Sequence, residues 1–378
     1  MHDVYDFISN TATINFLKAD NSLINIIILW HEYVMKPYDN ISKSLVLDII
    51  DLNISLTSNL KLDDSLKIIN NVSFSLLDSE VLGIIGNSGS GKTQLILALL
   101  GLSQKYAIIS GKIHFYKHHN NTNNLSPNKF IDLNSISTSE LNKIRYNDIS
   151  LVFQDALASL NPYLTIKSQM TEILILHKKM SYKDALAYSI TMLDLVKIHN
   201  AQYKINLYPH EFSGGMRQRV MIAMSLLTNP KLLIADEPTT ALDVTVQAQI
   251  LELLKDLRKE FGMTIIFITH DMGVVANLCD RVNVMYGGWL METATIEQVF
   301  ATPYHPYTSA LLETIPSIDH DVDKLKTIPG EPPNLLHLPQ GCPFQPRCSK
   351  VSAACSGQIP LRKIAPRHVM KCTVEVAQ

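Results

Sequence analysis

The chain is 378 residues long, a length that predicts two or three domains, and 46% of its residues are hydrophobic, which is ample for a buried core. Its formal net charge of −2 argues against nucleic acid or an anionic membrane as a partner held by bulk positive charge. No apolar run reaches the roughly 18 residues that cross a bilayer, and the apolar residues 23–30 lack the basic leader of a signal peptide, so we expect a cytoplasmic chain.

The first recognisable secondary structure begins after residue 44. Residues 1–44 carry no motif, and we interpret them as an N-terminal extension of unclear role. From Val46 apolar and polar residues alternate, which is typical of half-buried antiparallel strands. The side chains expected on the buried face are Ile50, Leu52, Ile54 and Leu56 in one strand and Ile69, Val72, Phe74 and Leu76 in the next. The asparagine-rich residues 118–128 predict a surface loop.

A phosphate-binding loop follows the apolar strand expected at residues 81–85. Glycines in such a loop let successive backbone N–H groups converge on one anion, and the helix that follows adds its positive N-terminus. Its lysine reaches the β- and γ-phosphates, and the next hydroxyl binds Mg²⁺. A plain turn between a core strand and a core helix is the alternative interpretation. The candidate ATP-binding residues here are Gly86, Asn87, Ser88, Gly89, Ser90, Gly91, Lys92 and Thr93.

Further polar residues follow other apolar strands. Asp236 and Glu237 end the strand expected at 232–235, and an acidic pair at the carboxyl end of a buried strand predicts a cation site. His270 follows the strand expected at 264–269. Gln154 ends the strand expected at 149–153, and residues 157–208 then have the periodicity of helices. This block predicts a helical subdomain inserted into an α/β core.

These motifs together resemble those of the ATP-binding cassette (ABC) ATPases. The match covers roughly residues 45–300 and rests on order and spacing: the phosphate loop, Gln154, the triplet Ser213, Gly214 and Gly215, the acidic pair, residues 241–243 and His270. The resemblance implies a P-loop α/β fold, with a mixed sheet, an antiparallel β subdomain and an inserted helical subdomain at about 157–212. It also implies ATP hydrolysis with ATP and Mg²⁺.

The family's catalytic roles fall on residues of this chain. Thr93, Gln154 and Asp236 would support Mg²⁺. Glu237 would be the general base that polarises the attacking water, and His270 would contact the γ-phosphate. No aromatic residue occurs at 62–65, where one commonly stacks on adenine in this family, so we expect apolar packing to hold the base.

Cassettes of this family close head to tail in pairs. Ser213, Gly214 and Gly215 would therefore complete the ATP site of a partner subunit, and Asp243 would lie at the interface between the two subunits.

The segment 301–378 resembles the C-terminal domain of oligopeptide/dipeptide importer ATPases. The match rests on residues 302–312, 328–333 and 341–348. It also contains four cysteines spaced C-x5-C-x6-C-x16-C, without the close pairs typical of zinc sites. Four thiolates suit a 4Fe-4S cluster, which members of this branch contain; zinc and uncommitted thiols are the alternatives. The candidate metal ligands are Cys342, Cys348, Cys355 and Cys372, whereas Cys279 is expected to be a packed hydrophobe.

The resemblance implies the ATPase subunit of an importer for peptides, or for nickel, at the cytoplasmic face of the inner membrane. Its expected partners are two transmembrane permease subunits, a second ABC ATPase and, indirectly, a substrate-binding protein. A heterodimer of ATPases is favoured and a homodimer is the alternative. A non-transport ABC-type ATPase with a soluble partner is the rival function. A cassette that binds ATP without hydrolysis is disfavoured because Glu237 and His270 are intact.

Overall fold

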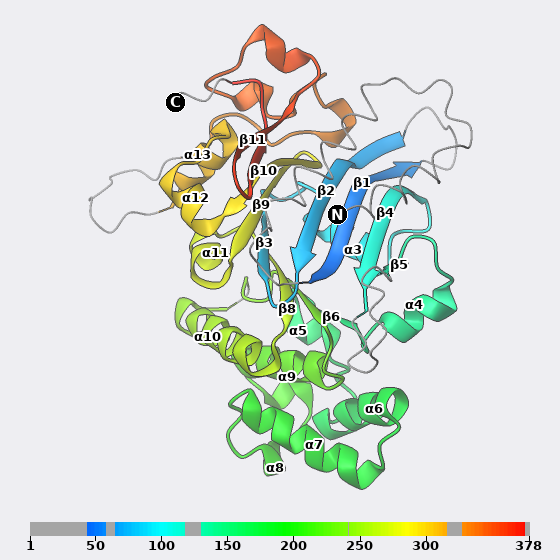
Figure 1. Ribbon diagram of the computed structural model, residues 1–378. Helices are drawn as coiled ribbons and strands as arrows, with labels where there is room; N and C mark the ends of the chain where they lie inside the picture. Colours follow the sequence, from blue (N-terminus) through cyan, green and yellow to red (C-terminus); the bar gives the residue numbers. More distant parts are fainter. Residues whose placement is uncertain (1–43, 58–64, 118–129, 241, 316–326, 375–378) are drawn as a thin grey trace, which may run out of the picture. The chain divides into compact units, whose positions relative to one another are not determined.

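The computed structural model describes residues 44–57, 65–117, 130–240, 242–315 and 327–374. The predictions for residues 1–43, for the loop at 118–128, for residues 62–64 beside the adenine and for Ala241 lie outside these ranges. The described part from residue 44 onward contains two β-sheets and the helices that cover them (Figure 1). The predicted α/β fold with a mixed sheet and an antiparallel sheet is confirmed.

The larger sheet has eight strands in the order β11-β12-β10-β9-β3-β8-β7-β6. Neighbours from β9 to β6 run parallel, whereas β10, β11 and β12 are antiparallel additions. These strands are β3 (Val81–Ile85), β6 (Ile149–Val152), β7 (Leu232–Asp236), β8 (Thr264–Thr269), β9 (Arg281–Tyr286), β10 (Trp289–Thr295), β11 (Leu361–Ala365) and β12 (His368–Lys371).

The parallel strands are buried on both faces. In β8, Ile265 and Phe267 join one hydrophobic core, while Ile266 and Ile268 join the other. Because side chains of a strand alternate between two covered faces, the whole segment must be apolar. This is why apolar runs alone located β3, β6, β7 and β8 in the sequence.

The smaller sheet is antiparallel, with the order β2-β1-β4-β5. Its strands are β1 (Leu45–Thr57), β2 (Ser65–Leu77), β4 (Ala107–Tyr116) and β5 (Phe130–Asp132). The alternation expected in β1 is wrong at Ile50, which is only partly buried, whereas its neighbour Ile49 is fully buried. Leu56 is also only partly buried, but it packs against the core. Asp51 has a φ of 49°, and the register with both neighbours shifts there. A β-bulge at Asp51 therefore reverses the phase of the pattern.

Helices cover both faces of the larger sheet (Figure 1). One core lies between this sheet, the antiparallel sheet and α3 (Lys92–Leu99), with α4 (Thr138–Ile144) at its edge. The other core lies under α9 (Gly214–Leu226), α10 (Val244–Phe261) and α11 (Met272–Leu278).

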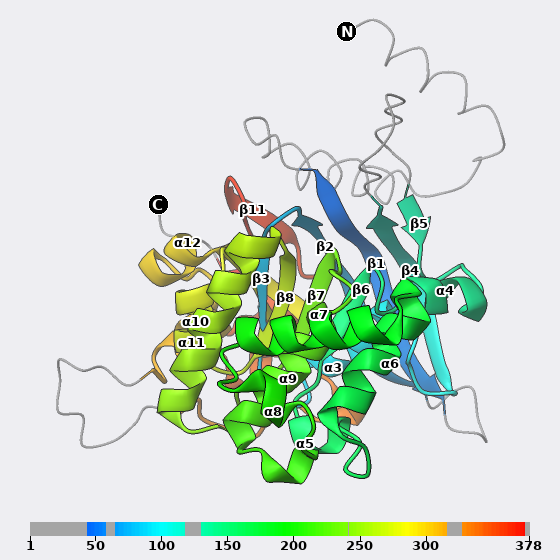
Figure 2. The same ribbon diagram turned by 90° about the horizontal axis from the view of Figure 1, so that it is seen from below.

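The segment between β6 and α9 is helical. Its elements are α5 (Ala156–Ser159), α6 (Ile166–Lys178), α7 (Tyr182–Leu195), α8 (Ala201–Lys204) and the 3₁₀ turn η2 (Pro209–Glu211). Thr165 and Ser181 begin α6 and α7, because each hydroxyl accepts a hydrogen bond from a free N–H group of the first turn. Figure 2 shows α6 and α7 crossing in front of the core strands, next to α9.

The C-terminal extension, residues 301–378, follows α12 (Ile296–Ala301) and is joined to the core through the larger sheet. Its described elements are α13 (Pro306–Leu312), the 3₁₀ turns η3 (Leu335–His337), η4 (Gln345–Arg347) and η5 (Ala353–Ser356), and the hairpin β11–β12, of which β12 pairs with β10. Two buried carboxylates fix it. Glu80 accepts hydrogen bonds from Arg281 of the core and from Arg367 of the β11–β12 turn. Glu292 of β10 accepts them from the backbone at Tyr304 and His305 and from the His368 ring.

No helix of the described residues is both long enough and apolar enough to pass through a membrane.

Candidate nucleotide-binding and catalytic site

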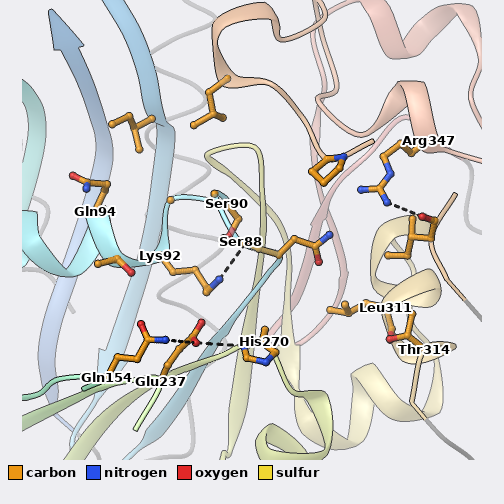
Figure 3. A pocket seen from close by; sticks show the side chains of 18 of the residues that line it. Ser88, Ser90, Lys92, Gln94, Gln154, Glu237, His270, Leu311, Thr314 and Arg347 are labelled. Carbon is orange, nitrogen blue, oxygen red and sulfur yellow. Dashed lines mark hydrogen bonds and ion pairs between the residues drawn. The ribbon is translucent and has the colours of Figure 1, made fainter. Parts of the chain in front are cut away.

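A cleft of about 1090 Å³ lies where the parallel strands end. Side chains that follow the carboxyl ends of β3, β6, β7 and β8 line it, which is the usual ligand position in a parallel sheet (Figure 3). The lining residues are Leu66, Ile68, Asn87, Ser88, Gly89, Ser90, Gly91, Lys92, Thr93, Gln94, Gln154, Glu237, His270, Leu311, Thr314, Thr327, Ile328, Pro332, Leu335 and Arg347.

The phosphate loop runs from β3 into α3. Gly86 must be glycine, because a Cβ there would lie 2.2 Å from the carbonyl oxygen of Met285. Gly91, the N-cap of α3, has a φ of 101°. The Lys92 ammonium donates hydrogen bonds to the carbonyls of Gly86 at 2.7 Å and Asn87 at 3.1 Å, so the Lys92 side chain turns back onto its own loop (Figure 3). Burial lowers the pKa of Lys92, and the charges of Glu237 and Asp236 oppose this shift.

Glu237 lines the cleft together with the phosphate loop, whereas Asp236, the last residue of β7, is not among the lining residues. The Thr93 side chain is near enough to the Asp236 carboxylate to lower its pKa, so the first turn of α3 and the end of β7 are neighbours. Burial raises the pKa of Asp236 and the charge of Glu237 raises it further, against the opposing effects of Thr93 and Lys92. A carboxylate held in this way is a good ligand for a cation that would relieve the repulsion. Glu237 has a φ of 45°, an unusual conformation for a residue with a side chain, of a kind that clusters at functional sites.

Three side chains converge on one oxygen of Glu237. Its Oε2 lies 3.3 Å from the Gln154 amide nitrogen and 3.4 Å from Nδ1 of His270 (Figure 3). The Thr240 hydroxyl lies 3.0 Å from the same oxygen. The structure thus brings together Gln154, Glu237 and His270, which come from the ends of three different strands.

The Ser213 triplet lies elsewhere. Ser213 caps α9, where its hydroxyl accepts from the Met216 N–H at 3.3 Å, and among the described residues the triplet is not part of the cleft lining. Gly215 allows α9 to approach α10 closely, since a Cβ there would lie 2.5 Å from Val246. Asp243 caps α10 and accepts from the Val246 N–H.

One wall of the cleft was not foreseen from the sequence. Leu311 and Thr314 of α13 and its following turn, together with Ile328, Leu335 and Arg347, belong to the C-terminal extension. They are more than 200 residues from the phosphate loop in sequence, and no local pattern places them there. Their apolar members face the same cleft as Leu66 and Ile68 of β2.

The four cysteines of the extension are free thiols. Cys342, Cys355 and Cys372 are buried and Cys348 is partly buried. Burial raises the pKa of Cys342 to about 11, and the charges of the other three thiols add to the shift, so the four lie near one another. In the described ranges, however, no three His, Cys, Asp or Glu side chains are gathered as a metal site. The predicted iron–sulfur cluster therefore has no support from the arrangement of these side chains. Cys279 is buried in the main core, as expected.

The fold and the site define a P-loop ATPase of the cassette type. A phosphate loop lies between β3 and α3, and an acidic pair ends a neighbouring parallel strand. A helical segment precedes the Ser-Gly-Gly helix start, and a histidine follows β8.

Comparison with known proteins names the family. The model of the ABC transporter family matches residues 69–240, and that of the oligopeptide/dipeptide transporter C-terminal region matches residues 291–355. The oligopeptide transport ATP-binding protein OppD of Escherichia coli K12 is 47% identical over 327 residues, which are 86% of this chain and 92% of OppD. AppD of Bacillus subtilis 168 is 46% identical over 289 residues, 76% of this chain and 84% of AppD. The chain belongs to the family of ABC transporter ATP-binding proteins, in its oligopeptide/dipeptide branch.

Solved cassettes have the same fold. The dimeric MJ0796 cassette in a post-hydrolysis state with ADP and Pi superimposes with a TM-score of 0.55 at 26% identity, over 66% of this chain and 98% of that one. The cbiO1 subunit from Clostridium perfringens, part of the cbiONQ transporter complex, superimposes with a TM-score of 0.55 at 28% identity, over 68% of this chain and 91% of that one.

Proposed function

We propose that this chain is the ATP-hydrolysing subunit of an ABC importer for di- or oligopeptides. The observation that carries the proposal is the convergence of Gln154, His270 and Thr240 on Glu237, opposite the phosphate loop. The peptide substrate is supported by relatives named as oligopeptide transport proteins and by the matching C-terminal region.

In this proposal the phosphate loop holds ATP. Backbone N–H groups of the loop and the N-terminus of α3 face the polyphosphate, and the Lys92 ammonium moves from its two loop carbonyls to the β- and γ-phosphates. Thr93, Asp236 and Gln154 would hold Mg²⁺, which when bound offsets phosphate charge. Thr93 already lies near the Asp236 carboxylate, since its side chain lowers the pKa of that group.

Glu237 would act as the general base. Its carboxylate accepts a proton from the attacking water, while His270 and Gln154 keep that water and the γ-phosphate aligned. Catalysis of this kind depends on positioning and charge stabilisation, with little covalent chemistry from the protein.

The site would be completed by a second ATPase subunit. Ser213, Gly214 and Gly215 form the start of α9 away from the chain's own cleft, so they are free to approach the nucleotide of a partner, with Asp243 beside them. The 13-residue α9 presents its N-terminal N–H groups to such an anion. We favour a heterodimer with a related ATPase, and a homodimer is the alternative.

The membrane partner would dock beside Gln154. Phe153, Leu157 and Tyr163 are large apolar or aromatic side chains exposed by 44%, 51% and 87%, on the segment that leads from β6 into the helices. Their proximity to Gln154 would link permease movement to the catalytic site. Two permease subunits, and through them a substrate-binding protein, would hold the chain peripherally on the cytoplasmic face of the inner membrane.

We also propose that Cys342, Cys348, Cys355 and Cys372 bind a 4Fe-4S cluster, with zinc as the alternative. The donor set supports this, since four thiols share one small segment. In addition, hydrogen bonds with Thr373 and Ser352 outweigh burial and lower the pKa of Cys355, which favours its thiolate.

Analysis of the purified chain for iron, acid-labile sulfide and zinc tests the proposal of a metal site at the four cysteines. A Cys342→Ser variant should lose the metal and a Cys279→Ser variant should keep it; metal-free wild-type protein would refute the proposal.

The enzymatic proposal is tested by Glu237→Gln. The amide cannot accept the proton, so we expect kcat for ATP to fall at least about 100-fold while the Kd for ATP stays within about threefold. Peptide uptake should fail in cells that carry only this variant. Glu252→Gln, at an exposed position on α10, is the control and should behave as wild type. If Glu237→Gln retains most of its ATPase rate, Glu237 is not the base.

A further inference from the structure

The hydroxyl of Tyr307 contacts the phosphate loop from the C-terminal extension. It donates a hydrogen bond to Oδ1 of Asn87 at 3.0 Å and accepts one from the Asn87 backbone N–H at 3.1 Å. Asn87 is the second residue of the loop, and the two residues are 220 positions apart. Tyr307 therefore holds both the backbone and the side chain of one phosphate-loop residue.

Tyr307 is itself firmly placed. Its side chain is fully buried, and its ring packs against Tyr286 of β9 at 4.6 Å and Phe344 at 5.2 Å between ring centres. The start of α13 is fixed as well, because Glu292 accepts the N–H of His305 at 3.0 Å. Burial raises the pKa of Tyr307, which keeps the hydroxyl protonated and able to donate.

The remainder of the loop is held by other contacts. The Ser90 carbonyl accepts from the Gly288 N–H at 3.1 Å, and Lys92 donates to the Asn87 carbonyl. A bound polyphosphate would draw the Lys92 ammonium away from that carbonyl. The Asn87 carbonyl would keep its hydrogen bond from the Ser90 N–H at 3.1 Å, which lies within the loop. The Tyr307 hydroxyl would then be the contact that ties Asn87 to the C-terminal extension.

We infer that Tyr307 is a positioning residue for ATP, which keeps the phosphate loop in its anion-binding shape by holding Asn87. The inference rests on the proposed function. A loop that is released from Tyr307 adopts the binding shape for only part of the time, and the apparent affinity for ATP falls by that fraction. Ground state and transition state lose the same contact, so KM rises while kcat changes little.

The test compares Tyr307→Phe with Tyr286→Phe. Each change removes one hydroxyl from the same buried aromatic cluster, but the Tyr286 hydroxyl accepts from Arg347 at 3.3 Å and does not contact the loop. We expect the Kd and KM for ATP of Tyr307→Phe to rise about tenfold at nearly constant kcat, as the loss of two partly buried hydrogen bonds predicts. Tyr286→Phe should stay within about twofold of wild type.

Thermal melting and a double variant complete the test. A merely structural role would lower the melting temperature of both variants and leave their ATP affinities alike. If Tyr307 acts through Asn87, the double variant Tyr307→Phe, Asn87→Ala should raise the Kd for ATP by less than the product of the two single fold-changes. If Tyr307→Phe binds ATP as tightly as the wild-type protein does in the same titration, the inference is overturned and the proposed function is left intact. Wild-type protein that fails to bind ATP overturns both.

Discussion

Replacement of Glu292 by glutamine should weaken the attachment of the C-terminal extension. The Glu292 side chain is 1% exposed. One carboxylate oxygen accepts from the Tyr304 N–H at 3.0 Å and from Nε2 of His368 at 2.7 Å, and the other accepts from the His305 N–H at 3.0 Å. An amide keeps one acceptor oxygen and turns an NH₂ group towards the remaining donors.

The size of the effect follows from these contacts. At least one buried N–H group loses its acceptor, at a cost of about 1–3 kcal/mol, and a donor now faces it. The charge-assisted bond to His368 is weakened too, so we expect a loss of about 2–4 kcal/mol. For a chain of 378 residues that corresponds to a melting temperature about 2–5 °C lower.

The assay is thermal unfolding followed by circular dichroism at several pH values. Burial acts to raise the pKa of Glu292, but the hydrogen bonds from His368 and the two backbone N–H groups bring it below the ordinary value of 4.5. The stabilisation by the carboxylate is thus complete above about pH 4.5 and is lost as the pH falls through the lower folded-state pKa. The difference between variant and wild type should therefore shrink in acid. A shift below 1 °C at pH 7, or a difference that grows in acid, would refute the reasoning.

Three further predictions follow from other contacts. Gly91→Ala should abolish measurable ATP binding, because a Cβ there would lie 2.6 Å from Ile69 and the φ of 101° disfavours a side chain; calorimetric titration with ATP checks this. Arg281→Met should lower the free energy of unfolding by about 3–5 kcal/mol, because it leaves Glu80 buried without its main partner; urea denaturation measures the change, and a loss below 1 kcal/mol would contradict it. Tyr163→Ser, at a side chain 87% exposed, should leave the ATPase activity of the isolated chain unchanged but reduce co-purification of permease subunits, and equal recovery would exclude this docking surface.

The sequence predicted most of the core and the phosphate-loop side of the site. Apolar runs located β3, β7 and β8 because both faces of these strands are buried, and the residues that follow them converge because parallel strands end at one edge. The phosphate loop is a local motif whose glycines are required by local geometry. Glu237 could therefore be found before its distances were known, whereas the resemblance to the ABC ATPases is what points to Gln154 and His270.

The remaining features depend on contacts that no local pattern encodes. The bulge at Asp51 arises from a positive φ at a residue that is not glycine. An uninterrupted alternation through β1 therefore places Ile50 on the buried face, where the structure has Ile49. The wall that Leu335 and Arg347 add to the cleft, and the bond from Tyr307 to Asn87, depend on how the extension folds back onto the core. The clustering of four cysteines in one segment predicts a metal site, but in the described residues their side chains are not gathered as metal ligands.

A chain that powers a membrane importer should be bound to its permease in the cell. Affinity purification of the tagged chain from detergent-solubilised membranes of its native cell, with mass spectrometry of the proteins that accompany it, tests this. We predict that two multi-span permease subunits and a second cassette ATPase will be recovered. Recovery of ribosomal or DNA-repair proteins without any permease would contradict the account and favour a non-transport ATPase.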